Sequence, residues 1–412
     1  MQKHALPILF FTIFLDMLGL GILLPVLPVL MVNPLSPHFV LPRGTSVDTG
    51  YILLGILTAI YSLGIFIASP IIGQFSDKFG RKKLLMLSIA GSIFGHLMFA
   101  FAILFKIVPL LFAARFFSGL SGGNIVVAQA AIADITTPEN RAKNFGLMGA
   151  AFGLGFVVGP FVGGKLADSS IVSWFGASTP FWFAAIMALC NFFFVATMFK
   201  ETHLTRNADL VVAWGKALNN IAHAFTHKTL LPIFTSGFFY QAGFAFYVTF
   251  SAVFLYSRFG FTEGSIGNYF AYVGAWIVFT QMVITRLLGK HFSETAILRW
   301  SLLGSGVCIM AVVFAPFASL LYFIVPFFAL SVGLSQANLL ALLSRRTSKD
   351  IQGEVLGING SLNALGTTLP PLIAGPIAAT LNPSAPLVVA SLIILLAGCY
   401  FIVTSRRTLH SV

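Results

Sequence analysis

Residues 67–87, IASPIIGQFSDKFGRKKLLML, place a cluster of charges and glycines between two apolar runs. The whole chain is 58% hydrophobic and 9% charged, whereas soluble domains carry roughly 25% charged residues. Such a composition predicts a protein embedded in a lipid bilayer. The cluster is then expected to be a short loop between two spanning helices, and its basic residues are expected to keep that loop on the cytoplasmic side.

Twelve apolar stretches are long enough to cross a bilayer. A spanning helix needs about 20 mainly apolar residues, because the hydrocarbon is about 30 Å thick and each residue rises about 1.5 Å. Each stretch is predicted to be a helix, since irregular backbone in lipid leaves its polar groups unpaired. We therefore predict an all-α membrane protein with spans near residues 6–32, 50–72, 83–104, 108–130, 144–166, 177–199, 229–256, 265–289, 295–315, 319–341, 353–377 and 384–404.

Lysine and arginine predict the orientation of these spans. With both termini in the cytoplasm, 19 of the 24 basic residues fall on the cytoplasmic side. Only Arg43, Lys106, Lys165 and Arg258 fall outside, and Arg115 lies within a span. The positive-inside rule favours this topology, so the net charge of +12 has a topological cause. A nucleic-acid partner is not expected, because it would need a soluble basic face.

The chain divides into two related halves. The longest non-spanning stretch covers residues 200–228, which we predict to be a cytoplasmic linker between six-helix bundles formed by residues 1–199 and 229–412. Residues 145–164 and 356–375 match at a constant offset of 211 residues in four glycines and one proline. Five matches in register indicate a duplication, and paired halves around a central site are typical of secondary transporters.

Several segments resemble a known family. The loop 73-GQFSDKFGRKKLL-85 resembles the major facilitator superfamily signature Gly-x-Leu-x-Asp-x-x-Gly-Arg-[Arg/Lys], with Phe75 where Leu is usual. The segment 111-LFAARFFSGLSGG-123 resembles the superfamily's Arg-x-x-x-Gly pattern in the fourth span, and 153-GLGFVVGPFVGG-164 resembles its fifth-span antiporter motif. The segments 15-LDMLGLGILLPVLP-28 and 131-AIADITTPENRAKNFG-146 are similar to twelve-span drug:proton antiporters of the tetracycline-exporter type.

The resemblance implies a proton-coupled transporter, not an enzyme, that exports a drug-like or amphipathic small molecule by alternating access. Its expected partners are the small-molecule substrate, protons and the lipid bilayer. The resemblance also implies a multi-pass, monomeric protein of a bacterial inner membrane. The three cysteines fall in apolar spans without metal-ligand spacing, so no metal or other cofactor is expected.

Conformational gating is predicted for two groups of residues. In the charged loop, two glycines allow a tight turn, and Arg81 is expected to pair with Asp134 and close the cytoplasmic side. In the fifth span, a Gly-Pro pair loosens the helical ladder locally. Topology alone also explains the basic residues of the loop, and tight packing alone also explains the glycines. The predicted gating residues are Gly73, Asp77, Gly80, Arg81, Asp134, Gly159 and Pro160.

Charges of the opposite sign stand at related positions in the second half. Arg345 occupies the place of Asp134 at the offset of 211 residues, and Lys290 lies near the place of Asp77 at an offset of 213.

Two ionisable side chains fall deep inside predicted spans, namely Asp16 in the first and Arg115 in the fourth. A charge at the bilayer centre costs about 2.5–3.5 kcal/mol, so each is expected to face a cavity or a partner. We predict that Asp16 takes up and releases the coupling proton, because burial favours its neutral form and a nearby Arg115 favours its charged form. His96 is a candidate relay. A static Asp16–Arg115 ion pair is the alternative.

Substrate contacts are predicted from polar and aromatic side chains in the second half, at Gln241, Phe244, Gln281, Gln336 and Asn338. The sequence departs from tetracycline exporters where these carry additional acids, because Gly95 and Ser305 stand at those positions. A metal–tetracycline cation would lack its counter-charges there. The expected substrate is therefore an uncharged, zwitterionic or anionic amphiphile.

Three other functions remain open at this point. A proton symporter or uniporter that imports a small nutrient fits the same fold, although the fifth-span motif favours antiport. A membrane enzyme would need a cluster of nucleophiles, acids or metal ligands at one interface, and the sequence shows none. A receptor of this fold is disfavoured by the presence of both Asp16 and Arg115.

Overall fold

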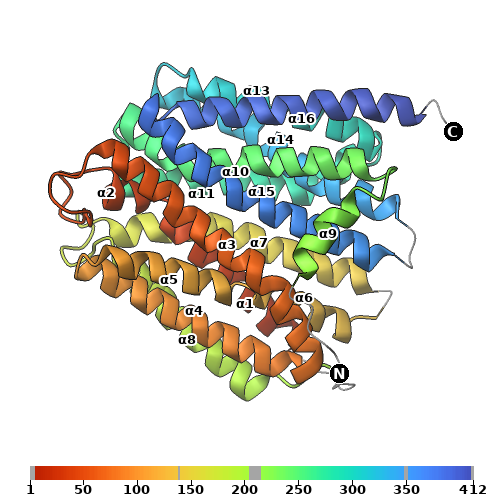
Figure 1. The fold of residues 1–412 in the computed structure, drawn as a ribbon, viewed down its shortest axis with the longest axis horizontal. Helices are drawn as coiled ribbons and strands as arrows, with labels where there is room; N and C mark the ends of the chain where they lie inside the picture. The colour runs from red at the N-terminus through yellow and green to blue at the C-terminus, as the bar shows by residue number, and fades with distance from the viewer. Residues whose placement is uncertain (1–4, 138–139, 204–214, 348–350, 410–412) are drawn as a thin grey trace. The chain divides into compact units, whose positions relative to one another are not determined.

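The computed structural model describes residues 5–137, 140–203, 215–347 and 351–409, and every regular element in these ranges is a helix (Figure 1). The prediction of an all-α protein is thus confirmed. The elements are α1 (Ala5–Leu23), α2 (Leu27–Met31), α3 (Val47–Phe79), α4 (Arg81–Leu104), α5 (Val108–Ser121), α6 (Asn124–Ile135), α7 (Arg141–Ala167), α8 (Thr179–Met198), α9 (Lys216–Ala224), α10 (Leu231–Phe259), α11 (Glu263–Phe279), the π-helix η2 (Thr280–Ile284), α12 (Thr285–Leu288), α13 (Glu294–Val313), α14 (Ala318–Arg345), α15 (Gln352–Thr380) and α16 (Ala385–Leu409).

Among the described residues, 11 helical segments are long and apolar enough to cross a membrane. Two of them contain more than one helix, because α5 and α6 form the segment Val108–Ile135, and α11, η2 and α12 form the segment Glu263–Leu288. The twelve predicted spans differ from this set by one. The 29-residue helix α15 is not among the 11, and it carries three prolines and a glutamate.

The helices form two compact units, each with its own packing. The first contains Met1–Gly50, Ile60–Trp214 and Phe261–Ala271, and the second contains Tyr51–Ala59, Gly215–Gly260 and Tyr272–Val412. In the first unit, α1 lies in extensive contact with α7, and α4 packs against α5 and α8. Its apolar core includes Leu9, Leu85, Val127, Ala151 and Val195, which come from five different helices.

Glycines allow α1 and α7 to approach closely. A Cβ atom on Gly155 would lie 2.7 Å from the Phe14 carbonyl oxygen, and one on Gly159 would lie 2.7 Å from the Leu18 carbonyl oxygen. Small residues of this kind let the backbones of two membrane helices meet. The predicted gating pair Gly159–Pro160 therefore lies at this contact, and α7 continues through Pro160 without a break.

The second unit is built mainly from α10, α13, α14, α15 and α16. Ser391 Oγ on α16 donates a hydrogen bond of 2.7 Å to the Gly306 carbonyl oxygen on α13, which joins these helices inside the unit. The short helix α9 packs on α15, where Asn220 Nδ2 lies 3.2 Å from Ser361 Oγ. Residues 215–228 of the predicted linker thus belong to the second unit, residues 200–203 belong to the first, and residues 204–214 lie outside the described residues.

Two glycines of α7 give a matched test of the α1–α7 contact. Gly155→Ala is expected to destabilise the protein by about 1–3 kcal/mol, because its methyl group overpacks the contact. Gly149→Ala is expected to be neutral or slightly stabilising, because nothing lies within 4 Å of the added Cβ and alanine favours a helix. Thermal unfolding in detergent, followed by tryptophan fluorescence, measures both changes. Equal melting temperatures for the two variants would contradict the tight contact.

Candidate functional site

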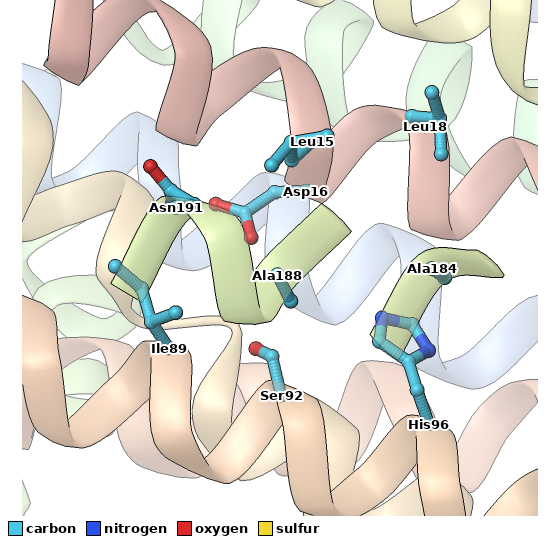
Figure 2. A pocket seen from close by; sticks show the side chains of 9 residues that line it. All are labelled: Leu15, Asp16, Leu18, Ile89, Ser92, His96, Ala184, Ala188 and Asn191. Atoms are coloured by element: carbon cyan, nitrogen blue, oxygen red, sulfur yellow. The ribbon is translucent and has the colours of Figure 1, made fainter. Parts of the chain in front are cut away.

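Asp16 lies in the first unit beside a small cavity between α1, α4 and α8. The cavity is lined by Leu15, Asp16, Leu18, Ile89, Ser92, His96, Ala184, Ala188 and Asn191 (Figure 2). The figure shows the Asp16 carboxylate on the α1 side and the His96 ring on the α4 side. A second cavity is lined by Asp16, Gly19, Leu20, Tyr61, Ser92, His96, Arg115, Ser118, Gly122 and Ile125. The sequence-predicted trio of Asp16, His96 and Arg115 therefore meets around one site.

One oxygen of the Asp16 carboxylate is satisfied and the other is not. Asn124 Nδ2 donates a hydrogen bond of 2.8 Å to Asp16 Oδ1. Asp16 Oδ2 and Asn124 Oδ1 are buried, and neither has a hydrogen-bond partner among the described residues. Buried polar atoms without partners are rare in folded proteins. This carboxylate consequently has room for one more donor, which a proton, a water molecule or a ligand can supply.

Arg115 on α5 is held by an aromatic ring instead of a carboxylate. Its Cζ atom lies 4.2 Å from the centre of the Tyr61 ring, which is a cation–π arrangement. Arg115 is 6% exposed, and its buried Nε atom has no hydrogen-bond partner within the described parts of the chain. Asp16 and Arg115, both of which the structure describes, form no ion pair with each other. The alternative of a static Asp16–Arg115 pair is therefore wrong for this conformation.

His96 packs directly against the first helix. A Cβ atom on Gly19 would lie 3.1 Å from His96 Cε1, so the absence of a side chain at Gly19 makes room for the imidazole. The cavity that His96 shares with Asp16 and Arg115 has a volume of about 30 Å3. This volume holds only a small number of water molecules. The site is thus suited to the passage of a proton, and it is too small for a drug-sized molecule.

Local sequence explains how these side chains reach the site. Gly122 and Gly123 separate α5 from α6, and Asn124 begins α6 directly after them. The break places Asn124 opposite Asp16, and Asn124 is fully buried. Sequence reasoning missed Asn124 and Tyr61. An asparagine that follows a Gly-Gly pair inside an apolar run was the available signal for Asn124, whereas nothing distinguishes Tyr61 from other aromatic residues in spans.

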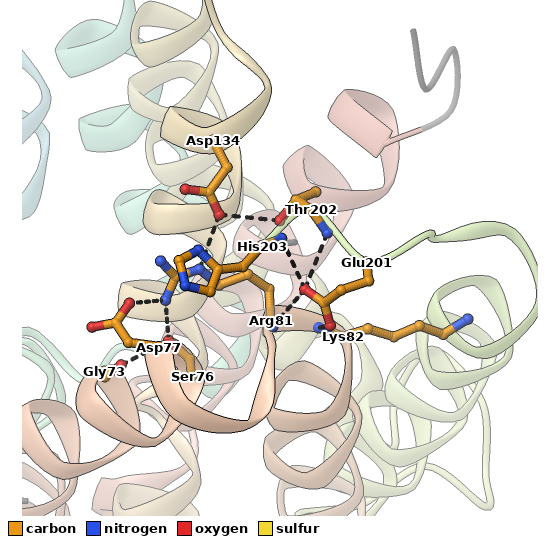
Figure 3. A network of polar contacts seen from close by, with 9 residues as sticks. All are labelled: Gly73, Ser76, Asp77, Arg81, Lys82, Asp134, Glu201, Thr202 and His203. Carbon is orange, nitrogen blue, oxygen red and sulfur yellow. Dashed lines mark hydrogen bonds and ion pairs between the residues drawn. The ribbon is translucent and has the colours of Figure 1, made fainter. Parts of the chain in front are cut away.

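The second predicted group forms a polar network at the junction of α3 and α4 (Figure 3). Arg81 Nε lies 3.0 Å from Asp134 Oδ2, so the predicted Arg81–Asp134 pair is confirmed. Arg81 also forms an ion pair with Asp77 and donates a hydrogen bond to Ser76 Oγ. Its side chain is 7% exposed, compared with 43% for Asp77. A buried arginine with two carboxylate partners joins α3, α4 and α6.

Both glycines of the loop have identifiable positions. Gly80 has φ = 100°, a conformation that favours glycine, and it lies between the end of α3 and the start of α4. The Gly73 carbonyl oxygen accepts a hydrogen bond of 2.8 Å from Ser76 Oγ, one turn before the ion pairs. The predicted group of Gly73, Asp77, Gly80, Arg81 and Asp134 is thereby brought together around the junction of α3 and α4.

Glu201 is a member of this network that the sequence analysis did not identify. Its carboxylate accepts hydrogen bonds from the backbone N–H groups of Arg81 at 2.8 Å and Lys82 at 3.2 Å, which are the first residues of α4. It also accepts bonds from the N–H groups of Thr202 and His203. The first N–H groups of a helix have no partner within the helix. Glu201 therefore caps α4 and ties it to the segment that follows α8.

The second unit carries a related ion pair of opposite polarity. Arg345 Nη1 at the end of α14 lies 3.0 Å from Glu294 Oε1 at the start of α13. Glu294 follows Arg81 by 213 residues, and Arg345 follows Asp134 by 211 residues. The expected sign inversion at Arg345 is therefore found in a pair that joins the equivalent helix ends. The acidic partner Glu294 was not foreseen from the sequence.

The five predicted substrate contacts lie in the second unit, on α10, η2 and α14. Asn338 is buried, and its Nδ2 atom donates a hydrogen bond of 2.8 Å to the Leu334 carbonyl oxygen of its own helix. Phe244 stacks between Tyr240 and Tyr247, whereas Gln336 is exposed. Gln281 lies in the π-helix, an irregularity that is frequent at functional sites. The two cavities around Asp16 contain none of these five residues.

The structure also shows the surroundings of the two positions at which the sequence departs from tetracycline exporters. Gly95 lies on α4 against Ser118, and Ser305 on α13 is fully buried and donates a hydrogen bond of 2.8 Å to the Ser301 carbonyl oxygen. No carboxylate takes their place within the cavities around Asp16, apart from Asp16 itself. In the described ranges, no group of three histidine, cysteine, aspartate or glutamate side chains is arranged to hold a metal ion.

Comparison with known proteins gives four findings. The sequence model described as Major Facilitator Superfamily matches residues 9–371. The chain is 29% identical over 397 residues to tetracycline resistance protein, class C, of Escherichia coli, with 95% of each protein covered. It is 30% identical over 380 residues to multidrug resistance protein 1 of Bacillus subtilis (strain 168), with 91% of this chain and 90% of that protein covered. The crystal structure of a D-xylose-proton symporter shares the fold, with a TM-score of 0.79 at 16% identity over 97% of each chain.

Replacement of Glu201 tests the cap on α4. Glu201→Gln is expected to destabilise the protein by about 0.5–2 kcal/mol, because an amide group replaces one of the oxygens that accept the N–H groups of α4. Amide hydrogen exchange at Arg81 and Lys82 is expected to become faster. Asp48→Asn is the control, since Asp48 lies in the first turn of α3 where Ser46 is the cap. Unchanged exchange at the start of α4 in Glu201→Gln would contradict the capping role.

Proposed function

This chain belongs to the Major Facilitator Superfamily, and we propose that it exports an amphipathic, drug-like molecule in exchange for protons by alternating access. It is a multi-pass membrane transporter and not an enzyme. The observation that carries the proposal is the Asp16 site, where one buried carboxylate oxygen has no hydrogen-bond partner among the described residues and Asp16 lines a cavity shared with His96 and Arg115. A small cavity that excludes drug-sized molecules and still reaches a titratable group supports a proton site separate from the substrate site.

Asp16 carries the coupling proton in this proposal. A carboxylate in an apolar span is costly when charged and less costly when neutral. Asn124 supports the charged form through its hydrogen bond, and the Arg115 guanidinium in the same cavity does so through its charge. A conformational change that moves Arg115 or admits water therefore alters the protonation of Asp16. His96 lines both cavities, and it offers an imidazole through which the proton reaches Asp16.

The network around Arg81 is the proposed gate. Arg81, Asp77, Asp134 and Glu201 fix the ends of α3, α4 and α6 in one arrangement. A gate needs two discrete arrangements, and ion pairs that re-form between partners supply them. Gly159 and Pro160 add a second gating element, because they form the close contact of α7 with α1, the helix that carries Asp16. A change at Asp16 can therefore alter the α1–α7 contact, which is the second gating element.

The remaining proposals concern organisation. We propose α15 as the twelfth span, both termini in the cytoplasm, and two six-helix bundles formed by residues 1–199 and 229–412 around linker 200–228. The described helix α9 of this linker packs on α15. A monomer in a bacterial inner membrane is proposed, in line with the bacterial relatives. Gln241, Phe244, Gln281, Gln336 and Asn338 are proposed to contact the substrate.

Export is favoured over import. Both relatives described above are named for resistance to antibacterial compounds or drugs, and resistance follows from removal of a compound from the cell. Gly95 and Ser305, which stand where acids are expected in tetracycline exporters, favour an uncharged, zwitterionic or anionic amphiphile over a metal–tetracycline cation.

Proton release from everted vesicles tests the proposal. The vesicles hold an acidic interior, a pH-sensitive dye reports proton release, and lipophilic drugs, dyes and amphiphilic acids are added in turn. At least one compound is expected to trigger release in the native protein. Asp16→Asn is expected to abolish this release, because an amide cannot take up and give back a proton. Asp48→Asn is the matched control, since Asp48 is exposed at the start of α3, and it is expected to retain native coupling.

Two outcomes would overturn the proposal. If no compound releases protons, or if protons enter the vesicle together with the compound, the protein is not an exporter of this kind. If Asp16→Asn couples normally, the proton is carried elsewhere and Asp16 has a structural role. Binding of the active compound to both variants in detergent separates loss of coupling from loss of the folded protein.

A further inference from the structure

An apolar groove opens on the second unit, which does not contain Asp16, His96 or Arg115. It is lined by Leu288, Phe292, Ala296, Ile297, Trp300, Ser301, Leu330, Ser331 and Leu334, and it has a volume of about 300 Å3. Its floor is buried, since Ile297 is 7% and Leu334 4% exposed, whereas its rim is open, since Trp300 is 76% and Phe292 56% exposed. The groove follows the sides of α13 and α14 and begins at the turn between α12 and α13.

The hydroxyl group of Ser301, one of the two serines that line the groove, is engaged inside the unit. Ser335 Oγ donates a hydrogen bond of 3.0 Å to Ser301 Oγ, and Ser301 Oγ lies 3.3 Å from the Leu298 carbonyl oxygen to which it donates. The walls therefore offer hydrocarbon and aromatic surface. In a membrane-spanning unit, an open groove of this composition suits a hydrocarbon chain of the surrounding lipid.

The turn at the start of the groove is positively charged. Lys290 and His291 are exposed and stand between two lining residues, Leu288 and Phe292. The turn is tight, because the N–H of Phe292 donates to the Leu288 carbonyl oxygen at 2.9 Å. Arg286, on α12, is also exposed; it precedes Leu288 by two residues and so leaves the opposite side of this short helix, and its long side chain must extend around the helix end to approach the turn. The chain therefore carries two permanent positive charges in the segment that borders one end of the apolar groove.

The neighbouring charges do not neutralise Arg286 and Lys290. Glu294 is the sole acid between residues 264 and 353 of the sequence apart from Asp350, which lies outside the described residues. The Glu294 carboxylate is occupied by Arg345 at 3.0 Å. Arg299 is directed elsewhere, since its Nε atom donates a hydrogen bond of 2.9 Å to Ser405 Oγ on α16. Arg286 and Lys290 thus remain available for an anion beside the groove.

We propose that this groove binds one acyl chain of an anionic phospholipid, whose phosphate is held by Arg286 and Lys290. Basic residues between spanning helices on the cytoplasmic side suit anionic head groups, and the proposed topology places this turn on that side. The lipid would support the contact of α12 with α13 and α14 next to the π-helix that contains Gln281. The inference is independent of the transported substrate and of the role of Asp16.

Trp300 provides an intrinsic probe, because it lines the groove and is exposed. In a full-length variant that retains Trp300 and carries phenylalanine at the other four tryptophans, fluorescence is measured in vesicles that contain brominated lipids as quenchers. Brominated phosphatidylglycerol is expected to quench Trp300 at a several-fold lower mole fraction than brominated phosphatidylcholine. In Arg286→Gln and Lys290→Gln, this preference is expected to fall roughly fivefold for each charge removed. Lys83→Gln, an exposed charge of the first unit, is the matched control and is expected to keep the full preference.

Three results would overturn the proposal. Equal quenching by the two lipids would show a non-selective contact. A preference that persists in the Arg286→Gln, Lys290→Gln double variant would place the anion elsewhere. Loss of quenching when a transported compound is added would assign the groove to the substrate. Melting temperatures of all variants in detergent identify any variant that has lost its fold, and the single replacements, made at exposed positions, provide the same comparison if the double variant unfolds.

Discussion

A charged side chain inside hydrocarbon must find its partners within the protein, and this constraint organises the first unit. The alternative costs about 2.5–3.5 kcal/mol for each charge. Asp16 is met by Asn124 across the α1–α6 contact, and Arg115 is met by the face of Tyr61. Neither solution is complete, because Asp16 Oδ2 and Arg115 Nε stay without hydrogen-bond partners in the described structure. An incomplete solution is what a site that exchanges protons requires, since a fully satisfied network has no reason to change.

The same constraint explains the different character of the charged loop. Arg81 is as deeply buried as Arg115, but it has two carboxylates and a hydroxyl around it, and Glu201 closes the helix end beside it. Breaking such a network leaves a buried charge uncompensated, which is strongly destabilising. The loop therefore holds one arrangement firmly, whereas the Asp16 site holds its arrangement weakly. This contrast suits a division between a gate and a proton site.

The two units solve one structural problem with opposite charges. Arg81 and Asp134 join two helix ends in the first unit, and Glu294 and Arg345 join the corresponding ends in the second. An ion pair survives a reversal of its polarity, because its attraction depends on the product of the charges. The surroundings of the two pairs differ. The side chain of Arg345 is 72% exposed in its pair with Glu294, whereas the side chain of Arg81 is 7% exposed. A duplicated plan has thus become a buried network in one unit and a surface pair in the other.

Hydropathy, charge placement and motif spacing predicted the helical class, nearly all of the spanning segments, the Arg81–Asp134 pair and the meeting of Asp16, His96 and Arg115, because these depend on regularities along the chain. The partners of those residues depended on packing. Asn124, Tyr61 and Glu201 lie far from their partners in the sequence and carry ordinary side chains. The direction of each contact follows from which helix faces meet, and the close approach of α1 to α7 at Gly155 and Gly159 decides this for α1. Sequence alone therefore determined where charges stand in the membrane, and only the tertiary structure decided which groups compensate them, because compensation depends on distances of a few ångströms between separate helices.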